Sequence, residues 1–562
     1  MKKSSPKDEL LFLPLGGAGE IGMNLNLYGY GPEGKESWIM VDLGITFGNG
    51  TVPGVDVILP DPEFIVERKK KLKALVLTHA HEDHIGAVPY LWDRLRCPIY
   101  ATPFTVSILK NKLAEAKLLG EAEINVIPLN GSFSIGPFDL ELITLTHSIP
   151  EPNGIAIRTP LGTVLHTGDW KFDPNPVLGE VSDEAALRRL GDEGVLAVIC
   201  DSTNVFSPGT SGSEGDLLDG LVDVINTVEG RVVVTCFASN VARIETIARA
   251  AQQTGRSVVL SGRSLQRMVE AARENGYLQD TPKFLVEEDA KHLPRDNCLI
   301  ICTGSQGEPR ASLFRMAFEE HPRLKISSGD TVIFSARSIP GNEISIGRIQ
   351  NQLIRRGMRV VTDRDAFIHV SGHPCRDELI QMYQHVKPQI AVPVHGELRH
   401  LSEHAALART CQVAEAVINE NGGIVRLAPG PAGVIDHVPS GRLTLEGGRV
   451  VPLGGELVRG RTRALLNGAA VLTIAVDMQG DIVAEPKITT EGLVEPGSDD
   501  AIQIERTALE IAVGTLNSLP MADRRDDGAA AEAVRVAVRR FFRDTFGKRP
   551  VTTIHLVRIA DA

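Results

Sequence analysis

Four potential metal ligands fall within six residues directly after a strand-like run, and this feature constrains the fold more than any other. The run KALVLTH (73–79) leads into T-H-A-H-E-D-H-I-G (78–86). The ligands are His79, His81, Asp83 and His84. A loop at a strand end can turn the first two side chains to one metal ion and the last two to another. Because imidazole nitrogen suits zinc, manganese and iron, and a carboxylate adds a harder oxygen ligand, the segment predicts a metal site at a sheet edge.

Strand and helix patterns divide the rest of the chain into interleaved parts. Short β-branched runs separated by Gly and Pro fill roughly the first 200 residues. Between about 208 and 355, strands alternate with longer amphipathic helices, which predicts a βαβ unit with parallel strands. The first such pair is a strand at 231–240 and a helix at 241–255. The earlier strand pattern returns at 366–372, 388–397 and 422–430.

The C-terminal part follows a Gly- and Pro-rich passage at 428–460, which predicts a connecting segment. Strands at about 469–485 precede helices at 500–518 and 528–546, and a last strand is expected at 551–559. The second helix carries arginines on one face. Its other face is apolar, and the helix could serve a subunit interface or bind RNA, of which we favour the interface. The apolar residues are Val534, Val538, Phe541 and Phe542.

The H-x-H-x-D-H pattern after a strand resembles the metallo-β-lactamase superfamily. The resemblance implies an αββα sandwich that holds one or two metals at its edge. It also implies one more His and one more Asp, each just beyond a strand. His147 in LTHSIP and Asp169 in HTGDWKFD match these places, and Asp169 would bridge the metals. His166 is interpreted as a strand residue rather than a ligand.

Three later segments resemble motifs A, B and C of the β-CASP nucleases: Asp201 in CDSTN, His369 in FIHVSGH and His395 in PVHGE. Together with FASN, TGSQGEP and SIPGNE, they resemble the bacterial ribonuclease J family over nearly the whole chain. The resemblance implies an α/β fold in which a β-CASP cap is inserted into the metallo-β-lactamase sandwich and a small α/β domain follows. The implied parts are 1–207 and 356–430 for the sandwich, 208–355 for the cap, 431–465 for a linker and 466–562 for a C-terminal domain involved in oligomerisation.

This family carries two divalent ions, zinc or manganese, that hydrolyse RNA phosphodiesters through an attacking hydroxide. By resemblance, one ion would be held by His79, His81 and His147, and the other by Asp83, His84 and His395, with Asp169 between them. We expect His369 to be the general acid, oriented by Asp201. The implied activities are 5′→3′ exonucleolytic cleavage, favouring 5′-monophosphate ends, and endonucleolytic cleavage, in RNA maturation and decay.

Small residues after two strands are candidates for binding the RNA backbone and its 5′-monophosphate through backbone N–H groups and a helix start. Ordinary turns are the alternative. The candidates are Phe237, Ala238, Ser239, Asn240, His369, Val370, Ser371, Gly372 and His373. A loop with Gly54 and Asp56 is a weaker candidate for a structural calcium ion. Gly17-Ala-Gly19-Glu-Ile-Gly22 matches a dinucleotide fingerprint, but a strand rather than a helix follows, so we interpret it as a hairpin turn.

Composition limits the partners. The net charge of −12 opposes a protein that coats nucleic acid through overall basicity, yet 231–276 holds seven Arg against three Glu. We therefore expect a threaded single strand of RNA in a local groove. No apolar run is long enough to span a bilayer, and the seven scattered cysteines form no C-x-x-C pair, so we expect no membrane partner and a reduced cytoplasmic setting. A homodimer or homotetramer, and membership of an RNA-decay assembly, are further expectations from the resemblance.

Four other functions compete. A small-molecule hydrolase of the same fold lacks the inserted cap. A di-iron oxidoreductase typically has Glu where His81 stands. A DNA nuclease of the same β-CASP subgroup is disfavoured by His395, because histidine at motif C is typical of the RNA-processing branch. A non-catalytic RNA-binding paralogue would have lost metal ligands, whereas all seven are present here.

Overall fold

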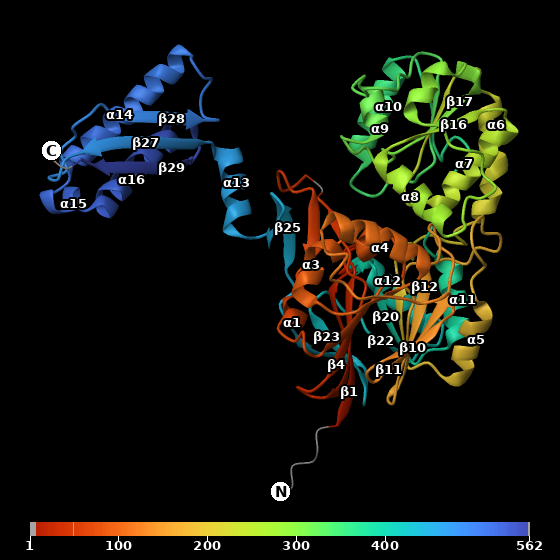
Figure 1. Ribbon diagram of the computed structural model, residues 1–562. Helices are drawn as coiled ribbons and strands as arrows, with labels where there is room; N and C mark the ends of the chain where they lie inside the picture. The colour runs from red at the N-terminus through yellow and green to blue at the C-terminus, as the bar shows by residue number, and fades with distance from the viewer. Residues whose placement is uncertain (1–6, 49, 560–562) are drawn as a thin grey trace, which may run out of the picture. The chain divides into compact units, whose positions relative to one another are not determined.

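The computed structural model describes residues 7–48 and 50–559 of the chain (Figure 1). The chain divides into two compact units. The first comprises the residues up to Phe47 together with Val57–Arg442, and the second comprises Gly48–Asp56 together with the residues from Leu443. Among the described residues, none of the helices is both long enough and apolar enough to cross a membrane.

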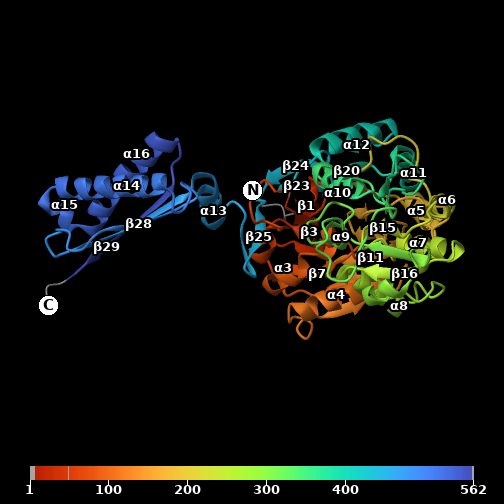
Figure 2. The same cartoon turned by 90° about the horizontal axis from the view of Figure 1, so that it is seen from above.

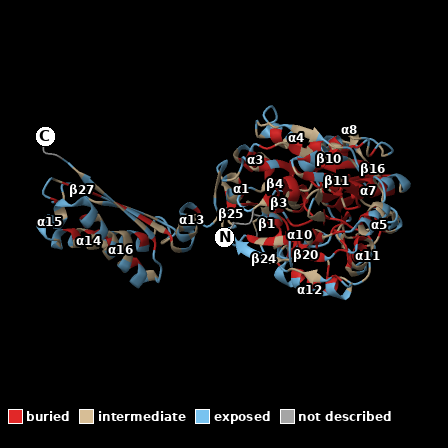
Figure 3. Ribbon diagram, turned by 90° about the horizontal axis from the view of Figure 1, so that it is seen from below, coloured by how far each residue is buried: buried red, intermediate tan, exposed pale blue. Residues whose placement is uncertain are grey.

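Two sheets form the centre of the first unit, with their apolar faces packed against each other. One sheet consists, in spatial order, of β24 (Gly433–His437), β23 (Gly423–Ala428), β1 (Asp8–Gly16), β3 (Leu25–Pro32), β4 (Ser37–Val41), β7 (Leu72–Val76), β8 (Ile99–Ala101) and β9 (Ile124–Val126). The other consists of β10 (Ser132–Ile135), β11 (Phe138–Thr144), β12 (Asn153–Thr159), β13 (Gly162–His166), β14 (Ala197–Asp201), β20 (Ile390–Val394) and β22 (Glu415–Ala416). The buried core between them is the red interior of Figure 3.

Helices cover the outer faces of this pair of sheets. The outer face of the second sheet packs against α5 (Glu184–Glu193), α11 (Arg376–Val386) and α12 (Leu398–Thr410). On the side of the first sheet lie α3 (Val88–Leu95) and α4 (Pro103–Glu115), as Figure 2 shows from above. The arrangement is the expected metallo-β-lactamase sandwich. The strand ends of both sheets supply the loops that carry the histidines.

The cap is a five-stranded parallel sheet flanked by helices. Its strands, in spatial order, are β16 (Ser257–Ser261), β17 (Cys298–Cys302), β15 (Val232–Thr235), β18 (Thr331–Phe334) and β19 (Arg359–Val361). Its main helices are α6 (Leu217–Asn226), α7 (Val241–Gln253), α8 (Arg263–Glu274), α9 (Ser312–Ala317) and α10 (Glu343–Arg355). The predicted alternation of parallel strands and helices is present. Helix α8 of the cap lies beside α4 of the sandwich (Figure 1).

Three sequence-based boundaries need correction. The cap extends past 355, because β19 pairs with β18 and completes the cap sheet. The segment 366–372 is a loop rather than a strand, because side chains satisfy its backbone; the Ser335 hydroxyl, for example, donates to the Ile368 carbonyl at 2.7 Å. The expected linker 431–465 is largely ordered: it contains β24, which pairs with β23, a hairpin and a helix.

The second unit is built on a three-stranded sheet with helices against one face. The strands are β28 (Lys487–Glu491), β27 (Ala469–Val476) and β29 (Val551–Arg558), and the helices are α13 (Glu456–Asn467), α14 (Asp499–Ser518), α15 (Met521–Arg525) and α16 (Asp527–Phe546). The hairpin of β25 (Arg442–Glu446) and β26 (Arg449–Pro452) turns through Gly447 and Gly448, both with positive φ, as a two-residue hairpin turn requires.

The apolar face of α16 is the module's own core rather than a free subunit interface, so the expectation for this helix is wrong. Val534, Val538 and Phe542 are fully buried against α14 and β27. A single sheet needs an apolar layer on at least one face, and α14 and α16 supply it here. Side chains on the opposite face of the sheet alternate toward solvent, including Val471, Val551 and Val557.

Candidate metal centre

The loop after β7 carries the first four ligands, and the segment after β4 holds that loop in place. Leu43 N–H donates to the His84 carbonyl at 2.7 Å, and Ile45 N–H donates to the Glu82 carbonyl at 3.0 Å. Gly44 lies between them, and a Cβ atom there would come within 1.7 Å of the Asp83 carbonyl oxygen. Only glycine therefore permits this close approach of the two backbones. The short helix α2 (Glu82–Ile85) then directs His84 into the core.

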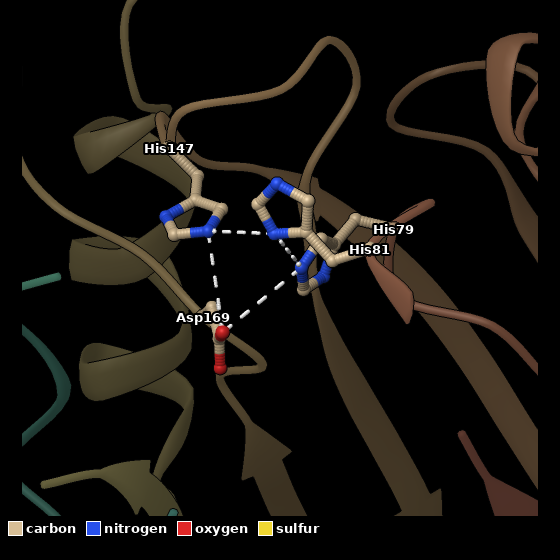
Figure 4. A group of neighbouring side chains, drawn as sticks. All are labelled: His79, His81, His147 and Asp169. Carbon is tan, nitrogen blue, oxygen red and sulfur yellow. Dashed lines mark hydrogen bonds and ion pairs between the residues drawn. The ribbon is translucent and has the colours of Figure 1, made fainter. Parts of the chain in front are cut away.

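Three histidines and one aspartate converge on a first point (Figure 4). His81 Nδ1 lies 3.0 Å from His79 Nε2 and 3.1 Å from His147 Nε2. One Asp169 carboxylate oxygen lies 4.0 Å from both of these Nε2 atoms. In Figure 4 the three rings face one another and the carboxylate, although the residues come from three different loops.

A second group shares the same carboxylate. It comprises Asp83, His84, His395 and Asp169. Asp169 Oδ2 lies 3.2 Å from His84 Nε2 and 3.6 Å from His395 Nε2. Asp83 Oδ2 lies 3.6 Å from His84 Nε2 and 3.7 Å from His395 Nε2. The ligand set predicted from the sequence is therefore assembled, with Asp169 common to both groups.

These donor sets fit divalent metal ions. In a tetrahedral site with bonds of the usual length, neighbouring ligand atoms lie about 3.3–3.6 Å apart, which is close to the separations found here. Nitrogen lone pairs that face one another repel unless a cation lies between them. The residues around both points are buried or half-buried, so few water molecules could relieve that repulsion. The structure supports divalent metal use by this chain.

Hydrogen bonds from the ligand histidines to neighbouring residues determine which ring nitrogen faces the centre of each ligand group. His84 Nδ1 donates to Asp42 at 2.7 Å, and His147 Nδ1 donates to the Gly372 carbonyl at 2.5 Å. His395 Nδ1 donates to Asn24 Oδ1 at 3.1 Å. In each case Nε2 is left with a lone pair for metal. Such partners raise the basicity of a ligand and hold its ring in position.

We expect Asp42→Ala to weaken metal binding by about 10–100-fold, the usual cost of losing such a partner. Asp42 also accepts from the N–H and the hydroxyl of Thr78, so the whole loop loses its anchor. Titration of the metal-free protein with Zn²⁺ and Mn²⁺ measures the change. Tyr28→Phe is the matched control, because it removes a 2.8 Å hydrogen bond to His166, a buried histidine outside both groups. Unchanged affinity in Asp42→Ala would contradict the anchoring role.

Burial favours the neutral, metal-binding state of the three imidazoles in the first group, whereas burial of His84 is outweighed by the carboxylates of Asp169, Asp83 and Asp42, which raise its pKa well above the usual value. Burial lowers the pKa of His79 and His147 well below the usual value, and that of His81 to about 4. Neutral imidazole has a free lone pair, whereas the protonated ring has none. His166, as predicted, is not part of either group and instead pairs with Tyr28.

The prediction that Asp201 orients His369 is wrong, because His373 occupies that place. His373 Nδ1 lies 2.8 Å from Asp201 Oδ2 and 3.9 Å from Asp169 Oδ2. The segment 366–372 does not continue as a strand, so His373, directly after it, reaches Asp201 instead of His369 within it. Burial opposes protonation of His373, but the Asp201 and Asp169 carboxylates outweigh it and raise its pKa to about 9.

His369 lies instead beside the guanidinium of Arg243, with Nδ1 at 3.2 Å from Nη1. Burial and then the positive charge of Arg243 lower the pKa of His369 well below its usual value. A general acid must hold a proton that it can release, so a histidine beside an arginine is unsuited to that role. His373 has the charge environment that the role requires.

The other predicted substrate-binding residues lie in two neighbouring loops. Phe237–Asn240 joins β15 to α7, and the Asn240 side chain caps α7 by accepting from Arg243 N–H at 2.9 Å. The Ser371 hydroxyl accepts from Asn204 Nδ2 at 2.7 Å, which braces the loop that ends in His373. Gly372 lies so close to His147 that a Cβ atom would come within 2.8 Å of the ring.

A positively charged side chain from helix α13 lies against the loop proposed for calcium. A Cβ atom on Gly54 would lie 3.3 Å from the guanidinium carbon of Arg461, which pairs with Glu446. Within the described part of the chain, Asp56 belongs to none of the clusters of metal-ligating side chains. Like charges repel, so the guanidinium disfavours a calcium ion beside Gly54.

Sequence reasoning missed the residues behind the ligands. Asp42 has a detectable signal, since it is a charged residue directly after the apolar strand β4 and adopts φ of +63°. Asn24 and Arg243 have no comparable local pattern. They are recognised only from the hydrogen bonds they make across the fold.

Comparisons with known proteins agree with this geometry. Residues 31–212 match the metallo-beta-lactamase superfamily, 229–353 the beta-CASP domain of ribonuclease J, 357–419 the Zn-dependent metallo-hydrolase RNA specificity domain, and 456–559 the ribonuclease J C-terminal domain. A solved structure of a protein of unknown function from Enterococcus faecalis superposes with a TM-score of 0.51 at 17% identity, covering 74% of this chain and all of that one, which supports the fold alone.

Full-length relatives carry the same assignment. Ribonuclease J of Sinorhizobium meliloti is 46% identical over 552 residues, covering 98% of both chains. Ribonuclease J of Thermus thermophilus is 35% identical over 98% of this chain and 95% of its own, and that of Mycolicibacterium smegmatis is 38% identical over 97% and 96%. With its assembled histidine and aspartate groups and its inserted cap, the chain belongs to the ribonuclease J family of metal-dependent, hydrolytic ribonucleases.

Proposed function

We propose that this chain hydrolyses single-stranded RNA with two divalent ions, zinc or manganese, as a 5′→3′ exonuclease that favours 5′-monophosphate ends and as an endonuclease. The observation that carries the two-ion proposal is Asp169, whose one carboxylate oxygen lies within reach of two separate ligand groups. A carboxylate shared in this way suits a pair of ions acting on one phosphodiester.

The residues of the chain have distinct tasks in this proposal. His79, His81 and His147 hold one ion, and Asp83, His84 and His395 hold the other. When bound, the ions polarise the phosphodiester and activate a water molecule for attack on phosphorus. His373 donates a proton to the 3′ oxygen that leaves, and Asp201 holds the imidazole by its Nδ1, so that Nε2 carries the transferred proton.

A cleft of about 960 Å³ between α4 and the cap supports binding of an RNA strand. Glu82 of the metal loop lines it, so the cleft reaches the ligand-bearing segment. Its walls hold six basic side chains: Lys112, Arg263, Arg267, Arg310, Arg315 and Arg323. Several glutamates also line it and pair with some of these groups, as Glu115 does with Arg267. Phosphate oxygens of a threaded strand would compete for the arginines.

Other cap arginines bind the protein's own backbone instead of lining the cleft. Fewer arginines are therefore available to RNA than the count of charges in the sequence suggests. Arg256 is buried and donates to the carbonyls of Val228 and Gly230. Arg356 donates to the carbonyls of Met316, Ala317 and Ile326. These side chains stabilise the cap, so the local excess of arginine in the sequence overstates the charge available to RNA.

The function is tested with four matched substrates: 5′-monophosphorylated, 5′-triphosphorylated and 5′-hydroxyl RNA, and DNA of the same sequence. With Mn²⁺ or Zn²⁺, we expect mononucleotide release from the monophosphorylated RNA, and internal cleavage without that 5′ preference. Metal analysis should find about two divalent ions per chain. Equal release from DNA would favour a DNA nuclease of the same subgroup. No cleavage of any substrate would refute the proposal.

We further propose that the chain forms a homodimer or homotetramer. The C-terminal module has one sheet face covered by α14 and α16, whereas Val471, Val551 and Val557 on the other face are exposed. Exposed apolar patches on a sheet commonly mark a contact with another chain. Light scattering coupled to gel filtration gives the mass directly, and a monomer at micromolar concentration would refute this point.

A further inference from the structure

Arg243 is a fully buried arginine that the reaction outlined above does not use. It lies one turn into α7, and its guanidinium makes a bidentate pair with Glu214, with Nε at 2.5 Å from Oε1 and Nη2 at 2.9 Å from Oε2. Glu214 is also buried. A buried ion pair is costly to desolvate and is often no more stabilising than apolar residues of similar size. The pair of Arg243 and Glu214 is therefore not explained by stability alone.

The remaining donors of Arg243 point at the loop that leads to His373. Nη1 lies 2.8 Å from both the carbonyl and the hydroxyl of Ser335, and 3.2 Å from His369 Nδ1. Longer contacts reach the carbonyls of Ile368 and Val370, at 3.4 and 3.5 Å. The guanidinium thus binds three consecutive residues of the loop through one rigid group.

The contact with His369 determines the protonation of its ring. An arginine can only donate hydrogen bonds, so His369 Nδ1 must accept and cannot carry a proton. The proton of the neutral ring is then on Nε2. Among the described residues, no group accepts a hydrogen bond from His369 Nε2, although the residue is half-buried. An ordered donor without a protein acceptor is suited to an acceptor on a ligand, and phosphate oxygens are strong acceptors.

Glu214 is itself anchored to the segment that carries Asp169. Glu214 N–H donates to Asp173 Oδ2 at 2.9 Å, and the buried Lys171 amine lies 2.9 Å from the same carboxylate oxygen. Lys171 and Asp173 follow Asp169 in the chain. The ion pair therefore connects the metal-bearing segment of the sandwich to the cap helix and, through Arg243, to His369.

We propose that Arg243, supported by Glu214, is a positioning residue that holds His369 as a neutral Nε2–H donor to a phosphate oxygen of the RNA. This inference rests on the proposed hydrolysis of RNA and on the sequence-based expectation that the residues 369–373 bind the RNA backbone. It assigns His369 to substrate positioning and leaves proton donation to His373. Because lysine has one small ammonium group in place of a fork of donors, it cannot hold Glu214, Ser335 and His369 together.

A double-mutant cycle tests whether Arg243 acts through His369. We expect Arg243→Lys to lower kcat/KM on RNA by about 10–100-fold, the range for a lost charge-assisted hydrogen bond, with metal content unchanged. In a His369→Ala background the same substitution should cost less than about threefold. Losses that multiply in the double variant would overturn the proposal, since they would show a general structural effect. Arg256 is another buried cap arginine, and its hydrogen bonds to described residues go to the Val228 and Gly230 carbonyls, outside this loop. Arg256→Lys should therefore stay within about twofold of wild type.

A second readout does not depend on activity. In zinc-loaded protein with ¹⁵N-labelled histidine, the ring shifts distinguish the two neutral tautomers from the cation, and comparison with His369→Gln assigns His369. Wild type should show the Nε2–H tautomer, and the variant Arg243→Met with Glu214→Met should lose that fixed state while remaining folded, because both buried charges are removed together. An Nδ1–H or cationic His369 in wild type would overturn the proposal. Absence of RNA cleavage by wild type would instead refute the proposed function.

Discussion

Asp169→Asn is expected to abolish RNA hydrolysis and to lower bound metal at both ligand groups together. Within residues 7–48 and 50–559, this side chain alone is shared by the two groups, and its Oδ2 lies 3.2 Å from His84 Nε2 and 4.0 Å from His79 Nε2. An amide oxygen is neutral and cannot balance two cations as a carboxylate does. Since bound metal contributes several kcal/mol to transition-state stabilisation, activity should fall by at least about 10³-fold.

Elemental analysis after gel filtration, together with cleavage of 5′-monophosphorylated RNA, measures both effects. Asp183→Asn is the matched control, because Asp183 caps α5 by accepting from Ala186 N–H at 2.9 Å and asparagine caps a helix equally well. The control should retain metal and activity. If Asp169→Asn kept its full metal content, the carboxylate would not be a bridge. Two independent single-metal sites would then replace the shared site.

Most residues of the two candidate ligand groups are predictable from sequence because they occur in local patterns. The cluster at 78–86 needs only a strand end and a loop, and His147 and Asp169 each follow their own strand. Period-two strands with β-branched residues also predicted most of the sandwich and the parallel sheet of the cap. Each of these features is specified by residues close together in the chain, so a single sequence is sufficient to reveal it.

The errors arose where long-range contacts outweigh a local pattern. The segment AFIHVSG has strand composition, but Ser335 and Arg243 bind its carbonyls, so it remains a loop and places His373 rather than His369 at Asp201. The apolar face of α16 is correctly recognised from the sequence pattern. That pattern does not indicate whether the face packs within the same chain or against another chain. The role of Arg243 likewise cannot be read from a local pattern, because the partners of its side chain lie 29 to 127 positions away in the chain.

His373→Ala is expected to keep both metal groups intact and to lose about 10²–10⁴-fold in turnover, the usual contribution of a general acid. The imidazole contacts Asp201 at 2.8 Å and belongs to neither of the two groups that meet at the metal loop. It forms a smaller cluster with Asp169 and Asp201. Metal content measured alongside turnover separates this result from that of Asp169→Asn. A fall in bound metal comparable to the bridging variant would assign His373 to metal binding instead.

A substrate with sulfur in place of the leaving 3′ oxygen identifies the step that His373 serves. A thiol has a pKa near 8.5, far below that of water and simple alcohols, so a thiolate leaves without a proton. We therefore expect His373→Ala to cleave this substrate within about tenfold of the wild-type rate. His369→Ala, which removes the proposed phosphate contact, should be equally impaired on both substrates. A better leaving group compensates only for the loss of the proton donor. If this substrate rescued His369→Ala and not His373→Ala, His369 would be the general acid, and the assignment of that role to His373 from its contact with Asp201 would be wrong.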